Sequence, residues 1–164
     1  MRPARVPNRA MRSPPASEAR DMNGTGAHRG RPTAGALVVR VLVVTGLAVD
    51  AYIHIALASQ RPPAPPGGGL SQVTLFYAQG AAAAVAALLV LFTGARWAYV
   101  IAFLVAASAL GAILLYRYVN VGALGPLPNM YEPLWTTTKM VTSIAEAIAT
   151  LAAVAGIVGP GRSR

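Results

Sequence analysis

Residues 36–58 read ALVVRVLVVTGLAVDAYIHIALA, an apolar run that carries Asp50 and His54 four residues apart. A helix that crosses a bilayer needs about 20 predominantly apolar residues, and this run is long enough to do so. Three further apolar segments of similar length follow, at 74–93, 97–119 and 136–158. The pattern predicts an all-α fold, an integral membrane antiparallel four-helix bundle over residues 35–160.

The composition is also that of a membrane protein. The 164 residues are 55% hydrophobic and 12% charged, whereas about 25% of a typical soluble domain is charged. There is no cysteine, which excludes thiolate catalysis, iron–sulfur clusters and cysteine-ligated zinc. No GxxxxGK, HExxH or GxSxG motif is present. These absences favour a non-enzymatic protein with no resident cofactor.

The first 34 residues form a basic arm that we expect to be disordered, because they are rich in proline, glycine, serine and arginine and have no periodicity. Translation starting at Met11 or Met22 would shorten this arm. No aromatic residue is interleaved with its arginines, so nucleic acid is not an expected partner. A basic arm beside a membrane span instead sets orientation and touches anionic lipid. Eight of the 14 basic residues lie before residue 41: Arg2, Arg5, Arg9, Arg12, Arg20, Arg29, Arg31 and Arg40.

The distribution of Lys and Arg predicts the orientation. With the N-terminus inside, the inner side holds those eight arginines and Arg96, Arg162 and Arg164, while the outer side holds Arg61, Arg117 and Lys139. Both termini should therefore be cytoplasmic in a multi-pass protein of the cell membrane. The alternative, signal-peptide cleavage after ALAS at 56–59, requires an arm and an apolar run longer than an ordinary signal peptide has.

Polar residues inside the apolar segments are the candidate site. Asp50 and His54 share one helical face, and Gly46 one turn earlier adds a notch for a neighbouring helix. A carboxylate near the middle of the bilayer costs at least about 3 kcal/mol and must face protein or water. The fourth segment carries a polar stripe at spacing i, i+3, i+7, i+10, i+14, formed by Thr136, Lys139, Ser143, Glu146 and Thr150.

Small residues should let these polar faces meet inside the bundle. Two segments have such surfaces. The second segment has Gln79 with the GAAAAVAALL run, and the third has the AASALGA run around Ser108 and Gly111. We expect one polar cluster in the outer half of the membrane, in which Arg117 and Lys139 neutralise the two acids. Its members are Asp50, His54, Gln79, Arg117, Lys139, Ser143 and Glu146.

The cluster allows three interpretations. The first is a structural ion-pair network in a non-enzymatic accessory, partner-binding or ligand-binding membrane component. The second is a proton path through Asp50, His54 and Glu146 in a transport or sensing module. The third is a metal or quinone site in an accessory subunit of a membrane oxidoreductase. Two carboxylates and one imidazole suit iron, manganese or zinc, although three ligands from two helices do not by themselves predict a metal. Besides the lipid bilayer, partners would be copies of the chain or another membrane protein.

Three stretches carry a resemblance: VDAYIHIALA at 49–58, LLYRYVNVGALGPLPNMYEPLW at 114–135 and KMVTSIAEAIATLAA at 139–153. Together they resemble a group of small four-span integral membrane proteins of high-GC Gram-positive bacteria. The resemblance implies a compartment, the bacterial plasma membrane, and no chemistry. In span number the chain is also similar to the DoxX-like proteins, some of which are accessory subunits of membrane oxidoreductases.

Overall fold

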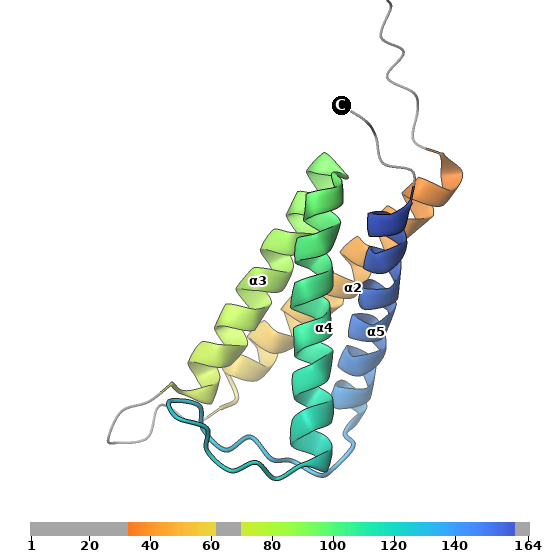
Figure 1. Ribbon diagram of the computed structural model, residues 1–164. Coiled ribbons are helices and arrows are strands. Elements are labelled where there is room, and N and C mark those ends of the chain that lie inside the picture. The colour runs from red at the N-terminus through yellow and green to blue at the C-terminus, as the bar shows by residue number, and fades with distance from the viewer. Residues whose placement is uncertain (1–32, 62–69, 160–164) are drawn as a thin grey trace, which may run out of the picture. The chain divides into compact units, whose positions relative to one another are not determined.

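The computed structural model of the chain describes residues 33–61 and 70–159. Its helices, labelled as in Figure 1, are α2 (Ala34–Ala58), α3 (Gln72–Thr93), α4 (Arg96–Tyr118) and α5 (Thr137–Val158). These described residues contain no strand, only one isolated bridge between Leu124 and Leu127. The predicted all-α class is confirmed, and each helix begins and ends within two residues of the expected range. The arm expected to be disordered lies, except for its last two residues, outside the described residues.

Three of the four helices begin at a hydroxyl cap. The side chains of Thr33, Ser71 and Thr136 each accept a hydrogen bond from the backbone N–H three residues later, at 3.3, 3.0 and 3.2 Å. Such a cap satisfies one of the N–H groups that a helix start leaves without a partner. The starts of these three helices are therefore determined by the capping residues just before them in the sequence.

All four helices are long and apolar enough to cross a membrane. Large apolar side chains also cover their outer faces, with Tyr52, Phe92, Leu104 and Leu151 all more than half exposed. Apolar surface on this scale is unfavourable in water and favourable in lipid. The described part of the chain is thus compatible with a multi-pass membrane protein.

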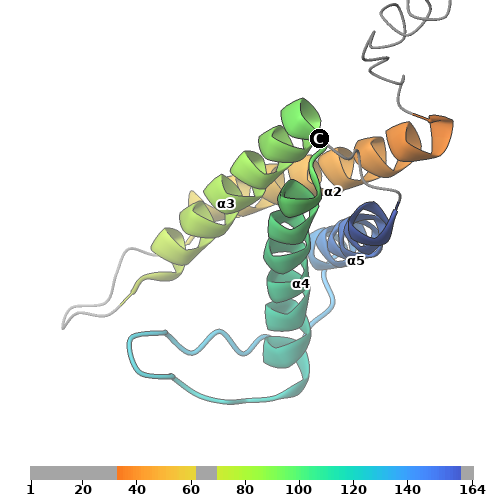
Figure 2. The same ribbon diagram turned by 45° about the horizontal axis from the view of Figure 1, so that its top comes forward.

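Small residues fill the contacts between helices. Helix α2 packs mainly against α3 and α5, and α4 packs against the same two helices (Figures 1 and 2). A Cβ added at Gly46 would lie 2.7 Å from the backbone oxygen of Ala145 on α5, and one added at Gly80 would lie 2.8 Å from Cγ1 of Ile55 on α2. The backbone of α2 therefore approaches both neighbours as closely as glycine allows.

The predicted AASALGA run of α4 faces inward through two of its alanines and not through Ser108 and Gly111. Ala102, Ala106 and Ala109 are buried, whereas Ser108 is exposed and donates to the Val105 carbonyl of its own helix at 3.0 Å. A Cβ added at Gly111 would meet nothing within 4 Å. Ser108 is two residues beyond Ala106, or about 200° around the helix, and so points to the opposite side.

One end of the helices carries the short turn between α3 and α4. Gly94 ends α3 with a positive φ of 55°, which lets α4 begin two residues later. A side chain at this position would also collide with the Arg40 guanidinium near the start of α2. Nη2 of Arg96 donates to the carbonyl of Gly159, just after α5, at 3.4 Å. The start of α2 and the end of α5 therefore lie beside this turn.

The opposite end carries the long loop 119–136, which runs across the helix ends (Figure 1). The backbone N–H of Leu70 donates to Pro126 at 2.9 Å, and that of Glu132 donates to Tyr116 at 3.1 Å. The loop thus joins the start of α3 to the end of α4. Consecutive helices alternate in direction between the two ends.

Candidate functional site

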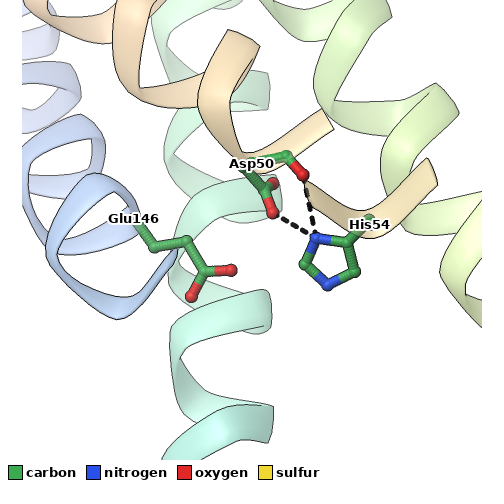
Figure 3. Close-up of side chains that lie close together, drawn as sticks. All are labelled: Asp50, His54 and Glu146. Atoms are coloured by element: carbon green, nitrogen blue, oxygen red, sulfur yellow. Dashed lines mark hydrogen bonds and ion pairs between the residues drawn. The ribbon is translucent and has the colours of Figure 1, made fainter. Parts of the chain in front are cut away.

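Asp50 and His54 meet on one face of α2, one turn apart (Figure 3). Nδ1 of His54 lies 3.0 Å from the backbone oxygen of Asp50 and 2.5 Å from its Oδ1. A backbone carbonyl can only accept, so Nδ1 carries the hydrogen. The neutral ring then keeps its lone pair on Nε2. The imidazole is therefore oriented by its own helix.

Glu146 on α5 points its carboxyl group at this pair (Figure 3). Asp50 and Glu146 are 0% exposed and His54 is 8% exposed. One candidate ligand atom from each of the three side chains lies within 4.8 Å of the other two. The close approach of the α2 and α5 backbones at Gly46 is what brings these faces together. We call these three residues the buried trio.

No amide, hydroxyl or basic side chain of the described residues donates to the carboxyl group of Glu146. Among the described residues, neither Oε1 nor Oε2 accepts a hydrogen bond. Oδ1 of Asp50 accepts none either, since its short contact with His54 does not have hydrogen-bond geometry. Leaving a buried polar group without a partner costs about 1–3 kcal/mol, and more when the group is charged. The trio can therefore be completed in two ways, by a proton shared between the two carboxyl groups or by a bound cation.

Helix α3 contributes Gln79. Its Nε2 donates to Oδ2 of Asp50 at 3.0 Å, across the contact that Gly80 makes with α2. The Asp50 carboxyl group is thereby fixed from a second helix. Three helices, α2, α3 and α5, build the site.

Lys139 was expected in the cluster, and the structure places its ammonium group elsewhere. Nζ donates to the backbone oxygens of Glu132 and Leu134 at 2.9 and 3.0 Å, and lies 3.5 Å from Oε2 of Glu132. The residue stands in the first turn of α5, so its long side chain reaches the loop at the end of the helices. It forms no ion pair with Glu146 among the described residues.

Arg117 does not neutralise the acids either. Its guanidinium lies over the rings of Tyr118 and Trp135, at 5.1 and 5.6 Å from their centroids. Its Nε has no hydrogen-bond partner within the described ranges. Because Arg117 is in the last turn of α4, aromatic rings at the helix end are nearer to it than the trio. The expected neutralisation by two bases is not found in residues 33–61 and 70–159.

The buried face of α5 is rotated slightly from the predicted stripe. Ser143 and Thr150 are only partly buried, although their hydroxyl oxygens are enclosed and have no hydrogen-bond partner among the described residues. Thr142 is nearly fully buried and donates to the carbonyl of Thr138 in its own helix at 2.9 Å. Sequence reasoning missed Thr142, although its spacing of four from Glu146 was available as a signal.

Phe76 on α3 is a second residue that the sequence did not indicate. Its ring centroid lies 5.5 Å from that of His54, and the Arg61 guanidinium lies 5.2 Å from the same ring. Arg61 in turn pairs with Oε2 of Glu132 at 3.9 Å. Phe76 thus lies between the trio and the charged groups at the loop end of the helices. Its position one turn before Gln79 and Gly80 could have placed it on this face.

The trio offers acid–base and metal-binding chemistry. With both carboxyl groups ionised and His54 neutral, it carries two negative charges, and no Lys or Arg pairs with it in the described part of the chain. A proton shared between the carboxyl groups or a cation would offset this charge. Comparison with known proteins gives no further guide, because no protein family, curated protein or solved structure matches the chain.

Proposed function

We propose that this chain is a non-enzymatic, multi-pass integral membrane protein that binds a small cation at Asp50, His54 and Glu146. The observation that carries the proposal is the Glu146 carboxyl group, which is fully buried, faces a second buried carboxyl group and accepts no hydrogen bond from the described residues. Two carboxylates so close in an apolar interior repel each other strongly. Either a proton shared between them or a bound cation removes that repulsion, and the proposal is that a cation does so.

The rival interpretation is a structural ion-pair network. Such a network stabilises a fold only when its members satisfy one another, and a half-satisfied network is less stable than an apolar core. Here the two bases that would complete it, Arg117 and Lys139, contact aromatic rings and loop carbonyls instead. The charge of the two acids is therefore left for a proton or a bound cation to offset.

The depth of the site also favours binding over simple anchoring. At 1.5 Å per residue, Asp50 lies about 12 Å from the end of α2 at Ala58, and Glu146 about 14 Å from the start of α5 at Thr137. Both depths approach the middle of a hydrocarbon core about 30 Å thick. Ionisable residues this deep in a membrane are expensive and mark ion or proton sites by default.

We place the protein in a bacterial plasma membrane with both termini cytoplasmic. The excess of Lys and Arg on the terminal side supports the orientation. In this arrangement the loop 119–136 faces outward, and a cation would reach the trio past Phe76.

The test is cation-dependent stability. The full chain is purified in mild detergent, and its unfolding temperature is measured in chloride salts of Na⁺, K⁺, Mg²⁺, Mn²⁺ and Zn²⁺. A ligand at 100 times its Kd stabilises the native state by about 2.7 kcal/mol. We expect at least one cation to raise the unfolding temperature of the wild type and not that of Glu146→Gln. Ser143→Ala, which removes a neighbouring polar atom without changing the charge, should respond like the wild type.

The structural interpretation makes the opposite prediction. If no salt distinguishes the wild type from Glu146→Gln, and that variant is also less stable than the wild type, the trio holds the helices together and the cation proposal is wrong.

A proton-linked module is the second candidate, because the three buried proton acceptors lie within 4.8 Å of one another. It predicts proton movement across proteoliposomes that report internal pH, lost in Glu146→Gln and retained in Ser143→Ala. Proton flux without any salt effect on stability would favour this candidate over a metal cation.

A further inference from the structure

We infer that the cation is a first-row transition-metal dication, held by Asp50, His54 and Glu146 and positioned by Gln79. This inference rests on the proposed function and names the class of its ligand.

The charge of the trio favours a dication. When both carboxyl groups are deprotonated and the imidazole is neutral, the trio carries two negative charges, so a dication alone gives a neutral site, whereas Na⁺ or K⁺ would do so only with a retained proton. Among the described residues no lysine, arginine or second histidine lies in the site to supply the difference. An uncompensated charge inside a membrane is costly, so the neutral complex is the stable one.

The ligand atoms of the trio favour a transition metal over Mg²⁺ or Ca²⁺. Mg²⁺ and Ca²⁺ prefer sites made entirely of oxygen, whereas imidazole suits zinc, iron, nickel and copper. The trio combines imidazole with two carboxylates and has no sulfur, because the chain has no cysteine. Mixed nitrogen and oxygen donors of this kind favour a borderline dication such as Zn²⁺, Fe²⁺ or Co²⁺.

The hydrogen bonds around the trio prepare it for a metal. Donation from Nδ1 of His54 to the backbone oxygen of Asp50 fixes the orientation of the ring and leaves a lone pair on Nε2. The hydrogen bond from Nε2 of Gln79 fixes Oδ2 of Asp50 and leaves Oδ1 without a hydrogen bond. Ligating residues in metal sites are typically oriented in this way by outer partners.

The burial and orientation of Glu146 support the site beyond the proximity of the three residues. Its side chain is 0% exposed, aims at the other two residues and has two oxygens without a hydrogen bond from any described residue. A carboxyl group kept only for packing would be expected to find a hydroxyl or amide donor. The nearby hydroxyl of Thr142 donates to its own helix instead.

Co²⁺ is the probe for the test, because its visible absorption reports its ligands and coordination number. The full chain, free of any histidine tag and treated with a chelator, is titrated with CoCl₂ in mild detergent. We expect one Co²⁺ per chain with visible bands, displaced by Zn²⁺ and not by an excess of Mg²⁺ or Ca²⁺. The variant His28→Gln controls for binding to the other histidine in the chain and should leave the bands unchanged.

Variants assign the ligands. Glu146→Gln and His54→Gln should each abolish the bands, and Gln79→Leu should weaken Co²⁺ binding about 10- to 100-fold, the usual effect of losing an outer partner. Ser143→Ala should bind like the wild type. Circular dichroism and elution volume check the fold, and if one ligand variant fails to fold, the other still tests the assignment.

Two results of the Co²⁺ titration would contradict this assignment. A wild type that binds no Co²⁺, or binds it equally well in folded Glu146→Gln and His54→Gln, overturns the transition-metal site. If Na⁺ or K⁺ still stabilises the wild type through Glu146, the cation-binding function survives this failure. If no salt does so, both proposals fall together.

Discussion

Gly46→Ala tests whether the close approach of α2 and α5 builds the site. The added Cβ would lie 2.7 Å from the Ala145 oxygen, and ordinary contact begins at 3.4 Å, so the two helices must separate locally by about 0.7 Å. Overpacking of this kind costs about 1–3 kcal/mol. Replacing a helical glycine also gains about 1 kcal/mol in helix propensity, so the net loss should be about 0–2 kcal/mol.

Gly111→Ala is the matched control, because it is also a glycine inside a helix and its added Cβ meets nothing within 4 Å. Subtracting the two variants cancels the propensity gain and leaves the steric cost of about 1–3 kcal/mol. Unfolding by sodium dodecyl sulfate in mild detergent, followed by the fluorescence of Trp97 and Trp135, measures the difference. Separating the helices also moves Glu146 away from Asp50, so Gly46→Ala should bind Co²⁺ more weakly than Gly111→Ala. Equal stability and equal Co²⁺ binding in the two variants would refute the close-packing explanation.

Three further predictions concern residues around the trio. Lys139→Gln should lower stability by about 1 kcal/mol in the same unfolding assay, because it loses hydrogen bonds to the loop. Its Co²⁺ affinity should stay unchanged, since Lys139 pairs with the loop and not with Glu146. A large change in affinity would contradict this placement. Thr136→Ala removes the cap of α5 and should cost about 1 kcal/mol on denaturant titration, whereas Thr136→Ser should retain most of it. Phe76→Ala should speed both association and release of Co²⁺ in stopped-flow absorbance with a smaller change in Kd; unchanged rates would show that the ring does not lie on the ion's route.

The helices could be predicted from the sequence because their signals are local. The length of each apolar run sets its helix, and hydroxyl residues such as Ser71 and Thr136 mark the starts. The pairing of Asp50 with His54 follows from a spacing of four, and burial of Glu146 follows from its depth in an apolar segment. These inferences need no knowledge of which helices are neighbours.

What the sequence could not supply were contacts that depend on tertiary structure. Long side chains choose among several partners, so the destinations of Arg117 and Lys139 depended on the path of the loop 119–136. The stripe containing Ser143 missed Thr142 because neighbouring residues differ by about 100° around a helix, and only packing decides which of them is buried. On α4 the same ambiguity hid that the AASALGA run faces inward through Ala106 and Ala109 and not through Ser108.

The glycines of the α2 contacts also affect which ion the trio could accept. Gly46 and Gly80 let α2 approach α5 and α3 more closely than a Cβ would allow, and this close packing sets the separation of the three donor groups. A large ion such as Ca²⁺ takes six to eight oxygen ligands at about 2.3–2.6 Å and needs a site that expands around it. A rigid site with three donors favours small ions that accept few ligands. Discrimination by ionic radius would then reside in two residues that never touch the ion, and enlarging either glycine would broaden the range of ions bound.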